Sequence, residues 1–300
     1  FSWLVLYTNT HFNSEHIGGH LLLLSVGLLY GRLDHLRFPH ILCAGGLLGL
    51  AFSCRFQIGF AILGLFLWMA HYFWKMHRPG RWFALLGGTA LSILLFTVVA
   101  DYFFYGRWVF TPYNYYYQNI ATGIMSRSSG VSPWYIYPLA VCAYLPFGPV
   151  YVLAAIAYLI KRPRDILSWI VGPFILCHLL IGHKEVRFLL PMLGFMPVMV
   201  MVMMEDWMGR FAILASNLTA IVRVLWTVNL LACLSLLLPA ATEIGGWYYL
   251  FRHYTKPTVL YYSFSEHQKL LFYKKPNLRL VKVAPGDPIP CPEGATNYLL

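Results

Sequence analysis

Long apolar stretches separated by short polar breaks make up most of the first 238 residues. The stretches are unbroken and lack the period-two alternation of barrel strands, so we expect them to be helices. A helix needs about 20 apolar residues to cross a bilayer, within a range of about 17–25. The pattern predicts an all-α polytopic membrane protein with about eight transmembrane helices, near residues 18–31, 41–54, 56–74, 83–100, 134–160, 165–182, 188–204 and 212–238.

Residues 239–300 have a different composition, with more Pro, Lys and Tyr. Short β-rich runs at 258–262 and 278–283 are typical of strands in a small module that faces water. We therefore expect two domains, a transmembrane domain over 1–238 and a C-terminal α/β module over 239–300 that lies outside the cytoplasm.

The composition excludes a soluble protein. Apolar residues make up 59% of the chain and charged residues only 11%, whereas soluble domains carry about 25% charged residues. The net charge of +11 comes from basic residues scattered through the loops, without the basic stripe of a nucleic-acid interface. We expect contacts with membrane lipids and none with nucleic acid. The six cysteines have no paired spacing, and nothing in the sequence indicates a divalent metal or another cofactor.

Basic residues are distributed unequally between the two sets of connections that alternating helices would create. One set holds nine Lys and Arg residues, in the connections 32–40, 75–81, 161–164 and 205–210. The opposite set holds five, in the connections 53–57, 101–133 and 183–187. The positive-inside rule assigns the first set to the cytoplasm. The long loop 101–133 and the unusual polar clusters then share the external side, and long loops are commonly functional.

The sharpest polar cluster is His183-Lys184-Glu185-Val186-Arg187, between two apolar segments. Four ionisable groups in five residues are costly at a membrane boundary unless they face water, a partner or a ligand. An interfacial turn would place Lys184 and Arg187 on lipid phosphates, but it would not require the His and the Glu. A cation cluster with one carboxylate suits a phosphate-binding site in which Glu185 orients a basic side chain, and we favour that interpretation.

The loop 101–133 combines aromatic and amide side chains, among them Tyr113, Asn114, Gln118 and Asn119. An aromatic belt at the membrane interface is one interpretation of this composition. A sugar site is the other, because aromatic rings stack on the apolar faces of sugars and amides hydrogen-bond to hydroxyl groups. Composition alone does not choose between the two.

Arg55 interrupts the apolar pattern in the short break 53–57. An Arg at such a break either extends to the membrane surface or holds an anion. Both uses would place its guanidinium on the external side of the predicted topology.

Several motifs resemble one enzyme family. The run from His183 to Phe188 is similar to the His-Lys-Glu-x-Arg-Phe signature of family 22 glycosyltransferases. The stretch from Asp101 to Asn114 is similar to that family's Asp…Tyr-Gly-x-Trp-Val-x-Thr-Pro-x-Asn pattern. Residues 9–14 lie where the family tends to read Arg-Thr-x-Ser-Asn-Ser, with Asn in place of the Arg and Phe in place of the first Ser. Arg55 occupies the place of an Arg in the family's paired-helix break, and the resemblance covers roughly residues 1–240 in order.

The resemblance implies a GT-C fold and an activity. The family consists of mannosyltransferases that build lipid-linked oligosaccharides and glycosylphosphatidylinositol anchors. It implies inverting transfer of a hexose, expected to be mannose, from a polyprenyl-phosphate donor to a lipid-linked glycan acceptor. The site would face the lumen of the endoplasmic reticulum or the bacterial periplasm. The donor phosphate is then expected on His183, Lys184, Arg187 and Arg55, and the sugar or acceptor on Tyr113, Asn114, Gln118 and Asn119.

None of these motifs supplies a catalytic base. The family's catalytic carboxylate is assigned to the first external loop, which would precede Phe1, and the chain opens like the end of a spanning segment. We therefore expect a chain that lacks its N-terminal part and a base upstream of Phe1. Asp101 and Glu185 are expected to be the only acids of the transmembrane domain on the external face, so they are the secondary candidates for the catalytic carboxylate, after a base upstream of Phe1. A transporter or flippase of lipid-linked sugars, which would need no base, is the alternative function, and a noncatalytic scaffold is a third.

Overall fold

The structure, a computed structural model, describes residues 13–31, 33–124, 127, 130–145, 147–211, 216–235, 252, 258–262, 278–283 and 296–299. The chain divides into two compact units, Phe1–Cys233 and Leu234–Leu300. The sequence places a domain boundary after residue 238. We describe each unit by itself.

The described part of the first unit is helical, which confirms the predicted class of secondary structure. Each apolar segment of the sequence forms one helix or a pair of helices. In chain order these elements are α2 (Ser14–Tyr30), η1 (Leu33–His35), α3 (Phe38–Cys54), η2 (Phe56–Ile58), α4 (Gly59–Lys75), α5 (Pro79–Ile93), η3 (Leu94–Val99), α6 (Ala100–Tyr105), α7 (Thr111–Tyr116), η4 (Tyr117–Ala121), α9 (Ile136–Tyr144), α10 (Gly148–Lys161), α11 (Ile166–Leu180), η5 (Val186–Met192), α12 (Met196–Arg210) and α14 (Leu218–Ser235).

Fewer helices have the length and composition of a membrane span than the eight expected. Among the described residues, Phe56–Lys75 and Pro79–Tyr105 have both. Two bent pairs raise the number to four if each pair is one span: Gly148–Lys161 with Ile166–Leu180, bent by 118°, and Val186–Met192 with Met196–Arg210, bent by 70°. α2 and α3 have only 17 residues each. The apolar stretch 134–160 is not one helix, because Pro149 starts a new helix, α10, after the end of α9.

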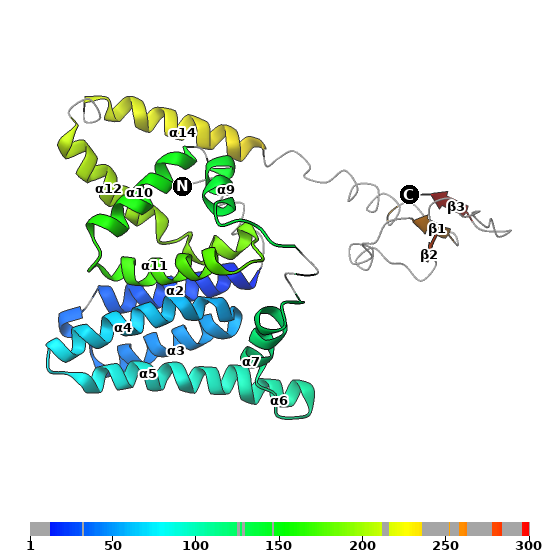
Figure 1. Cartoon of the computed structure of the whole chain (residues 1–300), viewed down its shortest axis with the longest axis horizontal. Coiled ribbons are helices and arrows are strands. Elements are labelled where there is room, and N and C mark those ends of the chain that lie inside the picture. The colour runs from blue at the N-terminus through cyan, green and yellow to red at the C-terminus, as the bar shows by residue number, and fades with distance from the viewer. Residues whose placement is uncertain are drawn as a thin grey trace. The chain divides into compact units, whose positions relative to one another are not determined.

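Helices α3 and α5 pack closely because glycines face the neighbouring backbone. A Cβ added at Gly45 would lie 2.4 Å from the carbonyl oxygen of Leu85, and one at Gly88 would lie 2.6 Å from that of Leu42. A methyl group does not fit at either position. α2 packs on α3, and α4 packs on both α5 and α11, so these five helices form one bundle (Figure 1).

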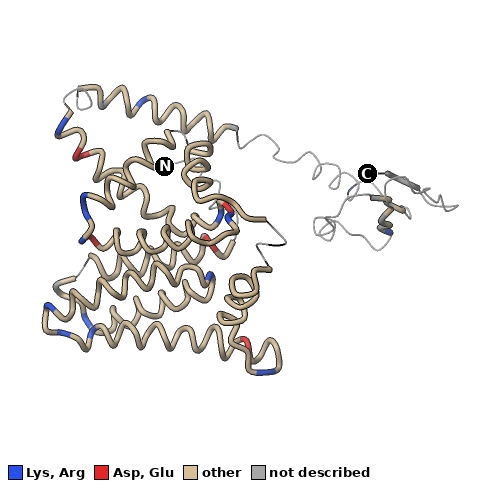
Figure 2. Tube along the Cα trace, in the orientation of Figure 1, with Lys and Arg blue, Asp and Glu red and all other residues tan. Residues whose placement is uncertain are grey.

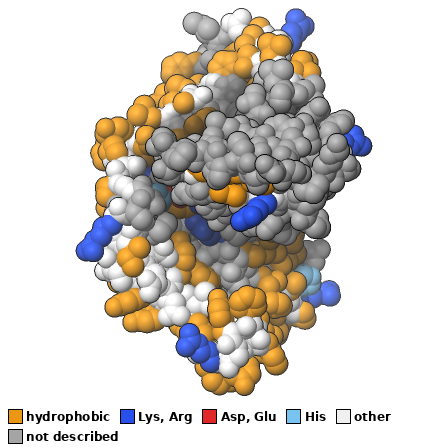
Figure 3. Space-filling view, turned by 90° about the vertical axis from the view of Figure 1, so that its right-hand side faces the viewer, with side chains coloured by type: hydrophobic (Ala, Val, Ile, Leu, Met, Phe, Trp, Pro, Cys, Tyr) orange, Lys and Arg blue, Asp and Glu red, His pale blue; other side chains and the backbone are white. Residues whose placement is uncertain are grey.

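The outside of the helical unit is apolar as well. Leu63, Leu91 and Ile160 are 57%, 57% and 73% exposed. Where described residues are visible in Figure 3, the surface carries mostly hydrophobic side chains with isolated Lys and Arg. Soluble monomers rarely expose apolar surface to this extent, whereas helices that face lipid do so. The unit is therefore that of a membrane protein.

Most charged residues lie at or near the ends of the helices (Figure 2). The α4–α5 and α10–α11 turns lie at one end of the unit and carry Lys and Arg (Figure 2); in sequence they are the connections 75–81 and 161–164. The start of α2 and the helix η5 pack together at the other end. The basic turns 75–81 and 161–164 therefore lie at the opposite end of the unit from the start of α2 and η5, as the predicted topology requires.

The second unit contains a parallel sheet. Its strands are β1 (Thr258–Tyr262), β2 (Leu278–Lys282) and β3 (Thr296–Leu299), in the order β2-β1-β3. Thr258 pairs with Leu278 on one side and with Thr296 on the other, and both pairings are parallel. Parallel strands need crossover connections, usually helices. Those connections lie outside the described residues, so the α/β module stays a prediction.

Candidate functional site

Glu15 lies in the first turn of α2, where the local sequence favours the start of a helix. The side chain of Asn13 caps the helix by accepting a hydrogen bond from the backbone N–H of His16 at 2.8 Å. An acidic residue in the first turn also interacts favourably with the helix dipole. Ser14 Oγ donates to Glu15 Oε2 at 3.1 Å. The carboxylate is thus held in place, and only 5% of the Glu15 side chain is exposed.

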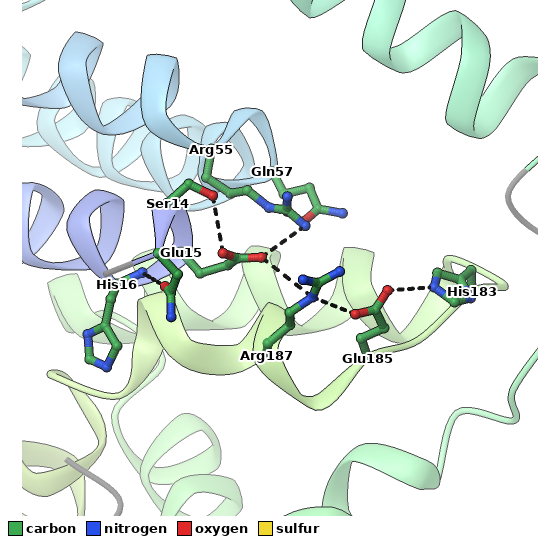
Figure 4. A network of polar contacts seen from close by, with 9 residues as sticks. Ser14, Glu15, His16, Arg55, Gln57, His183, Glu185 and Arg187 are labelled. Atoms are coloured by element: carbon green, nitrogen blue, oxygen red, sulfur yellow. Dashed lines mark hydrogen bonds and ion pairs between the residues drawn. The ribbon is translucent and has the colours of Figure 1, made fainter. Parts of the chain in front are cut away.

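Two arginines from separate elements approach this carboxylate (Figure 4). Arg55 lies in extended backbone between α3 and η2, and its Nη2 is 3.5 Å from Glu15 Oε1. Its Nε donates to Gln57 Oε1 at 3.0 Å. Arg187, on η5, places Nε 3.8 Å from the same Glu15 oxygen. The buried carboxylate therefore connects α2, the α3–η2 junction and η5.

Glu185 forms a second and more exposed ion pair with Arg187. Its Oε2 lies 2.5 Å from Arg187 Nε, and its Oε1 lies 2.9 Å from His183 Nε2. Nδ1 of His183 faces the carbonyl oxygen of Gly130 at 3.3 Å. Because both oxygens are acceptors, the two contacts are both hydrogen bonds only when the imidazole carries both ring protons.

The environment of Glu185 favours its charged form. Burial raises the pKa of the Glu185 carboxyl, but hydrogen bonds from His183 and Arg187 and the charges of both groups lower it further than burial raises it. The net result is a pKa below the ordinary value. Glu185 is therefore an ionised counter-ion for Arg187 at neutral pH.

Phe188 positions both guanidinium groups. The guanidinium carbons of Arg55 and Arg187 lie 4.9 Å and 5.8 Å from the centroid of its buried ring. Both distances are within the range of cation–π contacts. Of the five N–H donors of a guanidinium, Arg187 uses only the one at Nε in the contacts described, and 60% of its side chain is exposed. The arginine pair therefore has donors left for an anion.

Lys184 has a different environment from the two arginines. Its Nζ donates to the backbone oxygens of Ser132, at 3.1 Å, and Ile181, at 2.5 Å. The backbone N–H of Ser132 in turn donates to the oxygen of Gly182 at 3.0 Å. Desolvation lowers the pKa of the Lys184 ammonium. In this structure Lys184 therefore ties the end of the 101–133 loop to the turn that carries His183. A direct contact between Lys184 and phosphate stays a prediction.

Helix α7 and the π-helical turn η4 carry the four residues expected to bind sugar, Tyr113, Asn114, Gln118 and Asn119. The connection to the ion cluster is Tyr115, whose ring centroid lies 5.4 Å from that of Phe56, next to Arg55. Within the described residues, no contact joins the four side chains directly to the arginines. The structure brings their helix near the cluster without placing them in it.

Asp101 lies apart from the cluster. Its carboxylate accepts a hydrogen bond from the Thr111 hydroxyl, which ties α6 to α7. In the part of the chain that the structure describes, no contact links Asp101 to Glu15, Arg55 or Arg187. Its local role is to hold the turn around Gly106, whose φ of +65° suits glycine.

Glu15 was missed in the sequence. The expectation that Asp101 and Glu185 are the only acids on that side of the domain did not include Glu15, which contacts Arg55 and Arg187 in the same cluster as Glu185. A signal was present, since Asn13-Ser14-Glu15 combines a helix-capping residue with an acid just before the first apolar segment. The predicted topology puts that position on the same side as Arg55.

A small cavity of about 100 Å³ lies between α2 and the η5–α12 connection, lined by His16, Leu23 and Pro191 among others. Nε2 of His16 is buried without a hydrogen-bond partner in the described part of the structure. No three His, Cys, Asp or Glu side chains among the described residues gather to hold a metal ion.

Comparison with known proteins finds relatives that share one name, GPI mannosyltransferase 3. The chain is 30% identical over 140 residues to GPI mannosyltransferase 3 of Debaryomyces hansenii, which covers 45% of this chain and 24% of that protein. It is 32% identical over 117 residues to GPI mannosyltransferase 3 of Aspergillus fumigatus, covering 34% of this chain and 15% of that protein. For GPI mannosyltransferase 3 of Trypanosoma brucei brucei the identity is 37% over 109 residues, or 33% and 19% of the two chains. The chain thus matches less than a quarter of the length of these relatives.

No solved structure matches the chain significantly. The model of the Alg9-like mannosyltransferase family matches residues 1–286. That match includes the Glu15 turn, Arg55 and the run from His183 to Phe188. Because it extends over most of the sequence, the chain belongs to the Alg9-like mannosyltransferase family.

Proposed function

We propose that this chain forms the donor-binding part of a membrane mannosyltransferase. The enzyme transfers a hexose, mannose, from a polyprenyl-phosphate donor to a lipid-linked glycan acceptor. The observation that carries the proposal is that Arg55 and Arg187 contact the same oxygen of Glu15 and the same ring, that of Phe188. Family membership favours a transferase over a transporter of lipid-linked sugars.

The chemistry of this reaction needs cations at the phosphate. Transfer breaks the bond between the sugar's anomeric carbon and a phosphate oxygen, so negative charge develops on the leaving phosphate. Donors fixed in advance at that position stabilise the transition state, and arginine binds phosphate through paired N–H groups. Arg55 and Arg187 are the proposed phosphate ligands. His183 supplies a third positive group when doubly protonated, and Lys184 supports the turn that carries it.

The remaining site residues have proposed roles around the phosphate. Tyr113, Asn114, Gln118 and Asn119 position the donor sugar or the acceptor. We assign no base among the acids of the site, because Glu15 is paired with Arg55, Glu185 with Arg187 and Asp101 with Thr111.

The proposal includes a topology. The turns 75–81 and 161–164, at one end of the bundle, face the cytoplasm, and the Glu15–Glu185 cluster faces the lumen or periplasm. The apolar helices too short to be spans by themselves complete a multi-pass domain, and the second unit is an extracytoplasmic α/β module.

Mannose transfer in membranes containing the chain, from a polyprenyl-phosphate mannose donor, tests the proposal. We expect Arg187→Ala and Arg55→Ala each to lower the transfer rate by about a hundredfold or more, the typical effect of removing one preorganised donor. Lys161→Ala, at the opposite end of the bundle, is the matched control and should transfer at the wild-type rate. Wild-type rates in both arginine variants would overturn the phosphate assignment. Movement of a lipid-linked sugar across the membrane without transfer would favour the transporter.

A further inference from the structure

Two carboxylates share Arg187, and their environments differ. The Glu15 side chain is 5% exposed and lies near Arg55 as well as Arg187, whereas the Glu185 side chain is 31% exposed. Arg187 Nε is 2.5 Å from Glu185 and 3.8 Å from Glu15. In this state the guanidinium is therefore paired mainly with the exposed carboxylate.

The balance of charge limits how a phosphate can bind. The two carboxylates offset the charges of the two guanidinium groups, so a phosphate that binds Arg187 competes with a carboxylate for that guanidinium. Uncoupling a buried ion pair leaves an uncompensated buried charge and is costly. An exposed pair contributes little and separates easily, because water solvates both groups. Glu185 is thus the carboxylate that can separate from Arg187 when phosphate binds.

Resting on the function proposed above, we propose that the two glutamates have different tasks in donor binding. Glu15 is a positioning residue that keeps Arg55 and Arg187 together in both the empty and the occupied site. Glu185 is an exchangeable counter-ion, which holds Arg187 in the empty site and releases it to the phosphate of the donor. Neither glutamate forms or breaks a covalent bond.

The surroundings of each glutamate agree with its task. Glu15 is fixed by the hydrogen bond from Ser14 and by its place in the capped first turn of α2. Glu185 lies in the extended residue before η5, and its other partner is His183. When Arg187 turns to the phosphate, Glu185 keeps the hydrogen bond from His183, so the carboxylate is not left without a partner.

Anion binding to the purified full chain in detergent tests the division of tasks, with inorganic phosphate and citronellyl phosphate, a short prenyl phosphate, as probes in isothermal titration. Glu185→Gln removes the competitor for Arg187 and should lower the dissociation constant about two- to fivefold, the range of an exposed ion pair. Glu15→Gln removes the same charge but should raise the dissociation constant by about tenfold or more, because the arginines lose their common anchor. Glu205→Gln, on α12, controls for the loss of one negative charge elsewhere and should bind as the wild type does.

Glu15→Asp provides a variant that keeps the charge if Glu15→Gln does not fold. It shortens the side chain by one methylene and should also weaken binding, whereas a purely electrostatic role predicts wild-type affinity. In mannose transfer, Glu185→Gln should lower the KM for the donor, and Glu15→Asp should raise it.

The outcomes separate this inference from the proposed function. Tighter binding in both Gln variants, or wild-type affinity in Glu15→Asp, would overturn the positioning role while leaving the phosphate site intact. Weaker binding in Glu185→Gln would overturn the exchange. Absence of phosphate and citronellyl phosphate binding in the wild type would overturn the phosphate site itself.

Discussion

The carboxylate of Glu15 lies 3.5 Å from the guanidinium of Arg55, although two helices separate them in sequence. The contact follows from helix length. α2 and α3 pack against each other and have 17 residues each, and a short connection joins them. The residue in the first turn of α2 and the residue just after α3 therefore return to the same end of the bundle. η5 reaches that end because Gly19 lets the backbone of Pro191 approach α2.

The close approach of α3 and α5 gives a stability prediction with a control one residue away. A Cβ at Gly45 would lie 2.4 Å from the backbone oxygen of Leu85, whereas a Cβ at Gly46 meets nothing within 4 Å. Gly45→Ala should destabilise the protein by about 1–3 kcal/mol through overpacking. Gly46→Ala should stabilise it by about 0.5–1 kcal/mol, because alanine loses less backbone entropy in a helix.

Unfolding in detergent micelles, followed by circular dichroism against denaturant, measures both glycine variants. Equal stability of Gly45→Ala and Gly46→Ala would contradict the described contact between α3 and α5.

Lys184 gives a prediction about local order. Lys184→Met keeps the apolar stem but removes the ammonium that donates to Ser132 and Ile181. Each hydrogen bond from a charged donor contributes about 1.5–3 kcal/mol. The end of the 101–133 loop should therefore separate more often from the 181–184 turn. Amide hydrogen exchange at Ser132, whose N–H is bonded to Gly182, should become faster.

The same variant distinguishes a structural from a ligand-binding role for Lys184. Faster exchange together with wild-type phosphate affinity would assign Lys184 to the loop contact. Unchanged exchange with lost phosphate binding would instead make it a direct phosphate ligand, as the sequence motif alone indicated.

The sequence allowed the helices to be predicted because hydropathy and helical length are local properties. It did not allow the number of spans to be predicted, since the same apolar run can be one helix or two. The break before Pro149 is an example: the apolar run continues across it, so hydropathy predicts one helix, whereas Pro146 and Gly148-Pro149 are the local signals for the end of α9 and the start of α10.

Only the parts of the site that are local in sequence could be predicted. The run from His183 to Arg187 is a dense cluster of charge, so it was visible in the sequence. The contacts of both Arg55 and Arg187 with Glu15 depend on how three elements pack, which no local sequence pattern shows. Glu15 could have been found by following the predicted topology to the start of α2, whereas the contacts of Lys184 with backbone oxygens have no sequence signal.

The lowered pKa of Glu185 gives a prediction about pH. A carboxyl whose pKa is lower in the folded than in the unfolded state stabilises the protein above the unfolded pKa, and this contribution is lost as the pH falls through the folded pKa. The ordinary value for the group is 4.5. The melting temperature of the wild type should therefore exceed that of Glu185→Gln at neutral pH, and the difference should disappear at a pH below that value.

Glu205→Gln is the control for the pH series, because it removes a carboxyl outside the cluster. A difference between wild type and Glu185→Gln that persists in acid would show that the hydrogen-bonding groups of Glu185, and not its charge, provide the stability.

His16 gives the last prediction. Its side chain is buried, and Nε2 has no hydrogen-bond partner in the described part of the structure. An unsatisfied buried polar group costs about 1–3 kcal/mol. Phenylalanine has a similar flat ring without that group, and the cavity of about 100 Å³ beside His16 leaves room for the larger ring. His16→Phe should therefore stabilise the protein by about 1 kcal/mol or more, measured as above. His20→Phe is the matched control, because His20 stacks on His16 but is exposed. It loses only the contact of its Nδ1 with the backbone oxygen of His16 at 2.8 Å and should not stabilise the protein. A loss of stability in His16→Phe that is absent from His20→Phe would show that a bound water or ligand in the cavity satisfies Nε2.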